Sequence, residues 1–233
     1  MSRPLNIVWF KRDLRINDHR PLAEAARLGP VLPLYIVEPD LWAQPDASAR
    51  QWAFAAESLG ELQSALAGLG QPLCVMVGDA VSIFQEIQRR YGVASLWSHE
   101  ETGNGWTYAR DLAFAAWANA EGVPWREPRQ FGVIRRLKSR NGWANSWDRS
   151  MAEPVTAPPI ALQPIDGDWP THIPTFSELG LAADPCPYRQ PGGRAAALAT
   201  LESFLGERGR EYRYQMSSPV TAFDACSRLS PHL

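Results

Sequence analysis

Short apolar runs alternate along the first part of this chain with segments of helical period. Residues 5–10 read LNIVWF and are followed at once by charge, which is typical of a strand buried on both faces of a parallel sheet. Further strand-like runs occur at residues 31–37, 73–77, 94–98 and, more weakly, 123–126. Helical spacing of apolar residues marks residues 47–69, 79–91 and 107–120, and Asp46 and Asp79 are the expected N-caps of the first two. Because parallel strands need crossover connections, the alternation predicts an α/β fold: a doubly wound, Rossmann-like, five-stranded parallel sheet.

The amino-acid composition of the chain changes after about Ala152. From Glu153 to Gly193, prolines and glycines recur without helical period, which predicts a long proline-rich linker that either is functional or wraps another surface. A C-terminal helix is expected from about Gly193 to Glu207. The predicted organisation is therefore an α/β domain at 1–135, a linker at 136–192, and the start of a further, helical domain at 193–233.

Composition limits the classes of protein to which the chain can belong. With 45% hydrophobic residues, 21% charged residues and a formal net charge of −2, the chain resembles an ordinary globular protein. It lacks the basic excess of a dedicated nucleic-acid-binding domain, so any contact with DNA is expected to be local or elsewhere. Three widely spaced cysteines predict reduced thiols, with no disulfide and no metal site. No signal peptide or membrane span is evident, so we expect a cytoplasmic protein without membrane partners.

Polar residues follow the first strand-like run, at the end of a sheet of this class where ligands bind. Lys11, Arg12 and Asp13 could present cationic donors and a carboxylate there, since guanidinium groups bind carboxylates and phosphates bidentately. An alternative is that Asp13 pairs with an arginine and fixes the turn, and both roles can hold. No glycine-rich phosphate loop motif is present.

A second polar cluster follows the fourth run, in the sequence HEETGNGW at residues 99–106. Carboxylates at Glu100 and Glu101 can accept N–H bonds and Trp106 can stack, which suits a planar heterocycle. His99 lies beside them in the sequence. The alternative is a solvated polar loop with helix-capping acids. Neither an acid–base role nor a metal role is required of these carboxylates.

Four segments together resemble the cryptochrome/DNA photolyase family. They are VWFKRDLRINDHRPL at Val8–Leu22, RQWAFAAESL from Arg50, PGGRAAAL from Pro191, and SRLSPHL from Ser227. They occur in the order found in that family and span almost the whole chain. The resemblance implies an N-terminal antenna domain and its linker, ending where a helical FAD-binding domain begins.

The resemblance also implies cofactor sites. It places an antenna chromophore, such as a reduced folate (methenyltetrahydrofolate) or a deazaflavin, beside the two clusters and gives Arg50 a possible place there. It implies an incomplete FAD site made by Tyr214, Cys226, Ser227, Arg228, Leu229 and Ser230. Because the family often has Thr at the position of Cys226, one hydroxyl contact to FAD is in doubt.

The function implied is that of deoxyribodipyrimidine photolyase, the light-driven repair of pyrimidine dimers. Damaged DNA would be met through the helical domain that this chain lacks, and that domain would be its other partner. We therefore expect no catalytic residue in this chain and negligible binding of FAD by it alone. Two alternatives stay open: a cryptochrome photoreceptor, and a stand-alone nucleotide-binding module.

Overall fold

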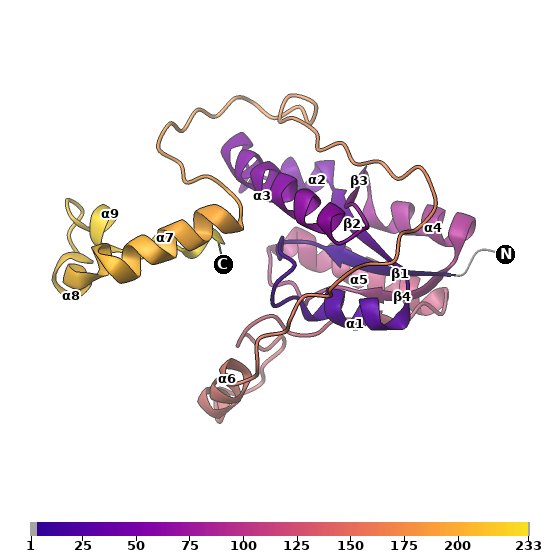
Figure 1. Ribbon diagram of the computed structural model, residues 1–233, viewed down its shortest axis with the longest axis horizontal. Helices are drawn as coiled ribbons and strands as arrows, with labels where there is room; N and C mark the ends of the chain where they lie inside the picture. Colours follow the sequence, from indigo (N-terminus) through magenta and orange to yellow (C-terminus); the bar gives the residue numbers. More distant parts are fainter. Residues whose placement is uncertain (1–3, 233) are drawn as a thin grey trace. The chain divides into compact units, whose positions relative to one another are not determined.

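A single parallel sheet organises the first part of the molecule (Figure 1). The computed structural model describes residues 4–232. The strands are β1 (Leu5–Phe10), β2 (Val31–Val37), β3 (Cys74–Val77), β4 (Val93–Trp97) and β5 (Trp125–Arg126), and they lie in the order β3-β2-β1-β4-β5. All neighbouring pairs are parallel. The predicted five-stranded, Rossmann-like sheet is confirmed.

Burial explains the apolar strands. Every residue of β1 and β2 is buried, as expected for central strands covered on both faces. The covering helices are α1 (Arg20–Leu28), α3 (Ala49–Gly68), α4 (Ala80–Tyr91) and α5 (Gly105–Ala120), with the short α2 (Pro39–Trp42) after β2. Trp9 packs against Phe84 of α4 and Phe114 of α5, with ring centroids 5.3 and 5.0 Å apart.

Local capping explains where these helices begin. The Asp79 side chain accepts the backbone N–H of Ser82 at 2.8 Å and caps α4, as the sequence predicts. The expectation that Asp46 caps α3 is wrong, because the helix begins at Ala49 and the carbonyl of Ser48 accepts its first hydrogen bond. Sequence periodicity also missed α1, a short helix that His19 caps.

Part of the irregular segment after β5 packs along the edge of the sheet. Helix α6 (Trp143–Met151) interrupts it and was not predicted. Beyond α6, the Val75 N–H donates to the carbonyl of Pro170 at 2.7 Å, and the Leu162 N–H donates to that of Leu69 at 2.7 Å. This strap, residues 156–171, therefore covers the otherwise open edge strand β3.

The chain divides into two compact units. The first contains Met1–Gln44 and Leu62–His172, and the second contains Pro45–Glu61 and Ile173–Leu233. The second unit carries α7 (Arg194–Gly206), η1 (Arg208–Glu211), α8 (Tyr212–Gln215), α9 (Ala222–Ala225) and η2 (Ser230–His232). The domain limits expected from the sequence stay a prediction.

Two glycines explain the PGGR segment in the second unit. A Cβ on Gly192 would lie 2.1 Å from the carbonyl oxygen of Phe54, and Gly193 has φ +97°, a conformation that glycine favours. The close approach lets the Glu61 carboxylate accept the Ala195 N–H at 3.2 Å, in the first turn of α7. A carboxylate there stabilises the positive end of the helix.

Candidate functional site

The strand order brings the two predicted polar clusters to one place. The chain winds one way through β1, β2 and β3 and then returns to β4 on the other side of β1, so the loops after β1 and β4 meet at the switch point. Arg12 Nε lies 3.0 Å from Glu101, and His99 Nδ1 lies 2.6 Å from Asp13. Segments almost ninety positions apart in the sequence thus share this edge of the sheet.

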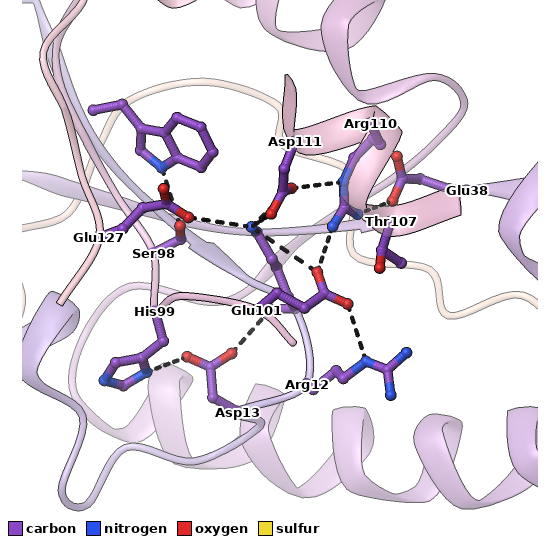
Figure 2. Close-up of polar contacts among 12 residues, drawn as sticks. Arg12, Asp13, Glu38, Ser98, His99, Glu101, Thr107, Arg110, Asp111 and Glu127 are labelled. Atoms are coloured by element: carbon purple, nitrogen blue, oxygen red, sulfur yellow. Dashed lines mark hydrogen bonds and ion pairs between the residues drawn. The ribbon is translucent and has the colours of Figure 1, made fainter. Parts of the chain in front are cut away.

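Arg110, on α5, lies at the centre of a buried ion network (Figure 2). Its guanidinium contacts the carboxylates of Glu38, Glu101 and Asp111, the last at 3.0 Å. Each of these side chains is at most 11% exposed. A buried charge destabilises the fold unless it is paired. Removing one member of this network would therefore leave the remaining charges buried and uncompensated.

Lys11 is the second buried cation of this network. Its Nζ lies 3.1 Å from Asp111 and 3.9 Å from both Glu101 and Glu127. The ammonium group also sits 4.6 Å from the ring centroid of Trp9 and 5.2 Å from that of Trp125. With only 5% of its side chain exposed, Lys11 acts as an internal counter-ion and not as a free donor for a ligand.

Arg135 closes the network from the segment after β5. It donates to the carbonyl of Glu101 at 2.7 Å and approaches Glu127 at 3.3 Å and Asp111 at 3.4 Å. Arg12, Lys11, Arg110 and Arg135 therefore face four carboxylates: Glu38, Glu101, Asp111 and Glu127. Burial nevertheless raises the pKa of Glu38 to about 7, against the opposing charge of Arg110.

Asp13 is held by two histidines, and the alternative of an arginine pair at this turn is wrong. His99 Nδ1 lies 2.6 Å and His19 Nε2 lies 2.7 Å from the same carboxylate oxygen. The Lys11 N–H donates to the other oxygen at 3.0 Å. Burial alone would raise the pKa of Asp13, but the charges and hydrogen bonds of His19 and His99 hold it well below its usual range.

The same three side chains resemble a set of metal ligands, since their donor atoms lie within 4.8 Å of one another. However, Nδ1 of His19 accepts the backbone N–H of Leu22 at 3.1 Å. A neutral imidazole that accepts at Nδ1 carries its hydrogen on Nε2, which leaves that nitrogen no lone pair for a cation. The arrangement favours a triad in which both imidazoles contact the Asp13 carboxylate, through a hydrogen bond with His99 and a close contact without hydrogen-bond geometry from His19. The expectation of no metal site stays a prediction.

Replacing His19 should change how stability depends on pH. Burial lowers the pKa of His19, so between this value and the ordinary 6.5 the unfolded chain binds more protons than the native one. Stability from this group is present above pH 6.5 and is lost as the pH falls. Asparagine can still cap α1 but cannot titrate.

We expect His19→Asn to lose less stability than the wild type between pH 7 and pH 5, in urea titrations at each pH. Glu38, whose pKa is raised, acts in the opposite direction in this range, so the comparison between the two proteins isolates His19. An identical pH dependence in both proteins would show that His19 is not buried in its neutral form.

Exposure divides the predicted antenna residues into two sets. Lys11, Asp13, His99 and the Glu101 side chain are buried in the ion network and the triad. The Arg12 side chain is 62% exposed, and Glu100 and Trp106 are half-buried. We call these three accessible residues the rim. The rim offers a guanidinium, a carboxylate and an indole, which suits a planar chromophore that has ring N–H groups.

One carboxylate oxygen of the ion network has no hydrogen-bond partner among the described residues. Glu38 Oε1, at the end of β2, makes no hydrogen bond within residues 4–232. Unsatisfied buried acceptors are uncommon. The observation is compatible with a ligand that donates a hydrogen bond at this edge of the sheet.

The remaining predicted site residues lie in the second unit. Arg50 contacts Asp184 at 3.2 Å, so its antenna role stays a prediction. The Arg208 guanidinium donates to the carbonyls of Cys226 and Ser227, which holds the start of the SRLSP segment. Arg228 has a positive φ of 61°, and Tyr214 is 77% exposed. The other two residues of the expected FAD set are the half-buried Leu229 and the exposed Ser230.

Sequence patterns did not predict several members of the ion network. Glu38 directly follows β2, so its position at a strand end was a usable signal. Arg110 and Asp111 lie in the middle of α5, where adjacent charges indicate a solvated face unless the tertiary contacts are known. Glu127 and Arg135 follow the weakest strand.

A doubly wound sheet with a polar switch point defines a class of ligand-binding α/β domain. Residues 6–133, more than half of the chain, match the DNA photolyase family. The deoxyribodipyrimidine photo-lyase of Escherichia coli is 44% identical over 249 residues, covering 98% of this chain and 51% of that protein. The cryptochrome DASH of Natronomonas pharaonis is 26% identical, covering 97% of this chain and 52% of that protein.

Solved structures show the same fold. A cryptochrome from Synechocystis matches with a TM-score of 0.80 at 20% identity, covering 99% of this chain and 52% of that one. A Sulfolobus tokodaii photolyase, described as containing two FAD molecules and implicating a novel light-harvesting cofactor, matches with a TM-score of 0.73 at 21% identity, covering 98% of this chain and 51% of that one.

This chain therefore belongs to the DNA photolyase family, and it corresponds to the N-terminal part of photolyases and cryptochromes. It spans about half the length of the curated relatives it matches. Within residues 4–232, no helix is both long and apolar enough to cross a bilayer.

Proposed function

We propose that this chain is the antenna domain of a deoxyribodipyrimidine photolyase, in which an antenna chromophore binds at the rim of Arg12, Glu100 and Trp106. The observation that carries the proposal is an accessible indole, carboxylate and guanidinium at the switch point, in a chain 44% identical to a photolyase. A reduced folate (methenyltetrahydrofolate) or a deazaflavin fits these groups, since each has a planar ring with polar edges.

The buried residues beneath this rim would position it. Glu101 fixes Arg12 and Arg110, while the Asp13 triad fixes the loop after β1. We assign Lys11, Asp13, His99 and Glu101 to this supporting role and leave ligand contact to the rim. Preorganised groups of this kind reduce the entropy lost when a ligand binds.

FAD would be held chiefly by a helical domain, with Tyr214 and residues 226–230 contributing the first contacts. Reduced FAD, when bound and excited, supplies an electron to a pyrimidine dimer flipped out of DNA. The residues present fit a small part of such a site: Ser227 and Ser230 have hydroxyls, and Arg208 orders the backbone beside them. We place the protein in the cytoplasm, in keeping with three free cysteines.

A cryptochrome photoreceptor is the second candidate, because proteins named cryptochrome DASH match 97% and 100% of the chain. It would use the same pigment and flavin but would signal through partners. A stand-alone nucleotide-binding module is the third, and it leaves the SRLSP segment unexplained.

The test uses protein in which this chain is joined to a helical FAD-binding domain. We expect flavin absorption bands, and loss of cyclobutane dimers from an irradiated oligonucleotide under blue light. Flavin bands without repair would favour the cryptochrome candidate. Folded protein that binds nucleotide but retains no flavin would favour the stand-alone module.

A further inference from the structure

A strongly basic segment follows the sheet in a chain whose net charge is −2. We call residues 129–151 the basic arm. From Arg129 to Trp147 it contains no acidic residue. The basic residues of the arm are Arg129, Arg135, Arg136, Lys138, Arg140 and Arg149, and its one acid is Asp148. Arg135 belongs to the ion network described above, whereas the other five cations have no part in the proposed antenna or flavin site.

The basic arm is anchored to the sheet and folded back on itself. Arg135 at its base donates to the carbonyl of Glu101 at 2.7 Å. The Trp143 indole donates to the carbonyl of Gly132 at 3.1 Å, and the Trp147 ring covers Gly132 so closely that a Cβ there would have no room. Figure 1 shows α6, which carries both tryptophans, standing clear of the sheet of its own unit. The arm therefore has a defined structure and projects from the sheet.

Most of the charge on this projection is uncompensated. Arg129, Arg136, Lys138 and Arg140 are exposed, and within residues 4–232 none of them pairs with a carboxylate. Arg136 donates a hydrogen bond to the Tyr108 hydroxyl, at 3.4 Å. On α6 of the same arm, Trp147 is 42% exposed. Exposed cations next to an accessible aromatic ring are the elements that bind single-stranded nucleic acids.

We propose that the basic arm binds single-stranded nucleic acid. Arg136, Lys138 and Arg140 contact successive phosphates, and a base stacks on the exposed face of Trp147. A membrane surface fits less well, since α6 has only nine residues and carries Asp148 and four other polar side chains. The contact uses neither chromophore nor lesion, so it stands apart from the proposed photochemistry.

The test measures binding of a fluorescein-labelled, undamaged 20-nucleotide oligothymidylate in the dark, by fluorescence anisotropy. The variant is Arg136→Ala/Lys138→Ala/Arg140→Ala. The control, Arg27→Ala/Arg89→Ala/Arg90→Ala, removes the same charge from exposed positions on α1 and α4. We expect the arm variant to bind at least about tenfold more weakly, with a salt dependence of log K smaller by about 2, and the control to lose less than about threefold.

Two further measurements test the stacking role of Trp147 and the preference for nucleic acid over a membrane. Trp147→Ala should weaken binding about tenfold while Trp147→Phe, which keeps an aromatic face, restores most of it; circular dichroism checks that both remain folded. Equal losses in the two triple variants, or no binding by the wild type at 50 mM salt, would overturn the proposal. So would binding to phosphatidylserine vesicles without binding to the oligonucleotide.

Discussion

Arg110→Ala should destabilise the first unit by about 3–5 kcal/mol, because it leaves the buried carboxylates of Glu38, Glu101 and Asp111 without their shared cation. For a protein of this size the loss corresponds to a fall of roughly 10 °C in melting temperature. The measurement is urea or thermal unfolding followed by circular dichroism at pH 7.

Arg12→Ala is the matched control for this prediction. Arg12 bonds to the same Glu101 carboxylate, but its side chain is 62% exposed, so its loss should cost less than about 1 kcal/mol. If the two variants were equally stable, the network would contribute no more than a surface ion pair, and the buried residues could not be described as the support of the rim.

Trp106→Ala should reduce the amount of antenna chromophore that copurifies, or its affinity, by about tenfold in protein that includes the helical domain. An accessible indole face contributes an aromatic contact of about 1 kcal/mol or more to a planar ligand, and its loss leaves the fold in place. Chromophore content is measured by near-ultraviolet absorption relative to flavin.

Tyr108→Ala provides the control, because Tyr108 lies on the same helix and is 55% exposed but is outside the rim. It should leave the chromophore content unchanged. Trp106 also lies 5.9 Å from the Arg110 guanidinium, a cation–π contact worth about 1 kcal/mol at most at a partly exposed site. If chromophore content fell only in proportion to lost stability, Trp106 would be a structural residue.

The sheet could be read from the sequence because its strands depend on local patterns. Continuous apolar runs such as residues 5–10 have few alternatives in a doubly wound fold, and the first strand was predicted with its observed limits. The position of the polar clusters followed from the same reasoning, since the switch-point rule needs only the strand order.

The interior of the site could not be predicted in this way. Whether Glu101 reaches a ligand or Arg110 depends on side-chain contacts between the loop after β4 and the middle of α5, which no local pattern encodes. The Asp13 partners were missed for a similar reason. His19 resembles an ordinary surface residue until α1, a short helix with a proline near its start, is known to exist.

The central claim is that the antenna chromophore lies against the rim of Arg12, Glu100 and Trp106. The most direct measurement is ¹⁹F NMR of 5-fluorotryptophan-labelled protein that includes the helical domain, titrated with methenyltetrahydrofolate and, separately, with a deazaflavin. The Trp106 signal, assigned by its absence in Trp106→Phe, should shift with one of the two chromophores while the Trp147 signal stays in place. Saturable binding of either chromophore that leaves the Trp106 signal unmoved would contradict the account.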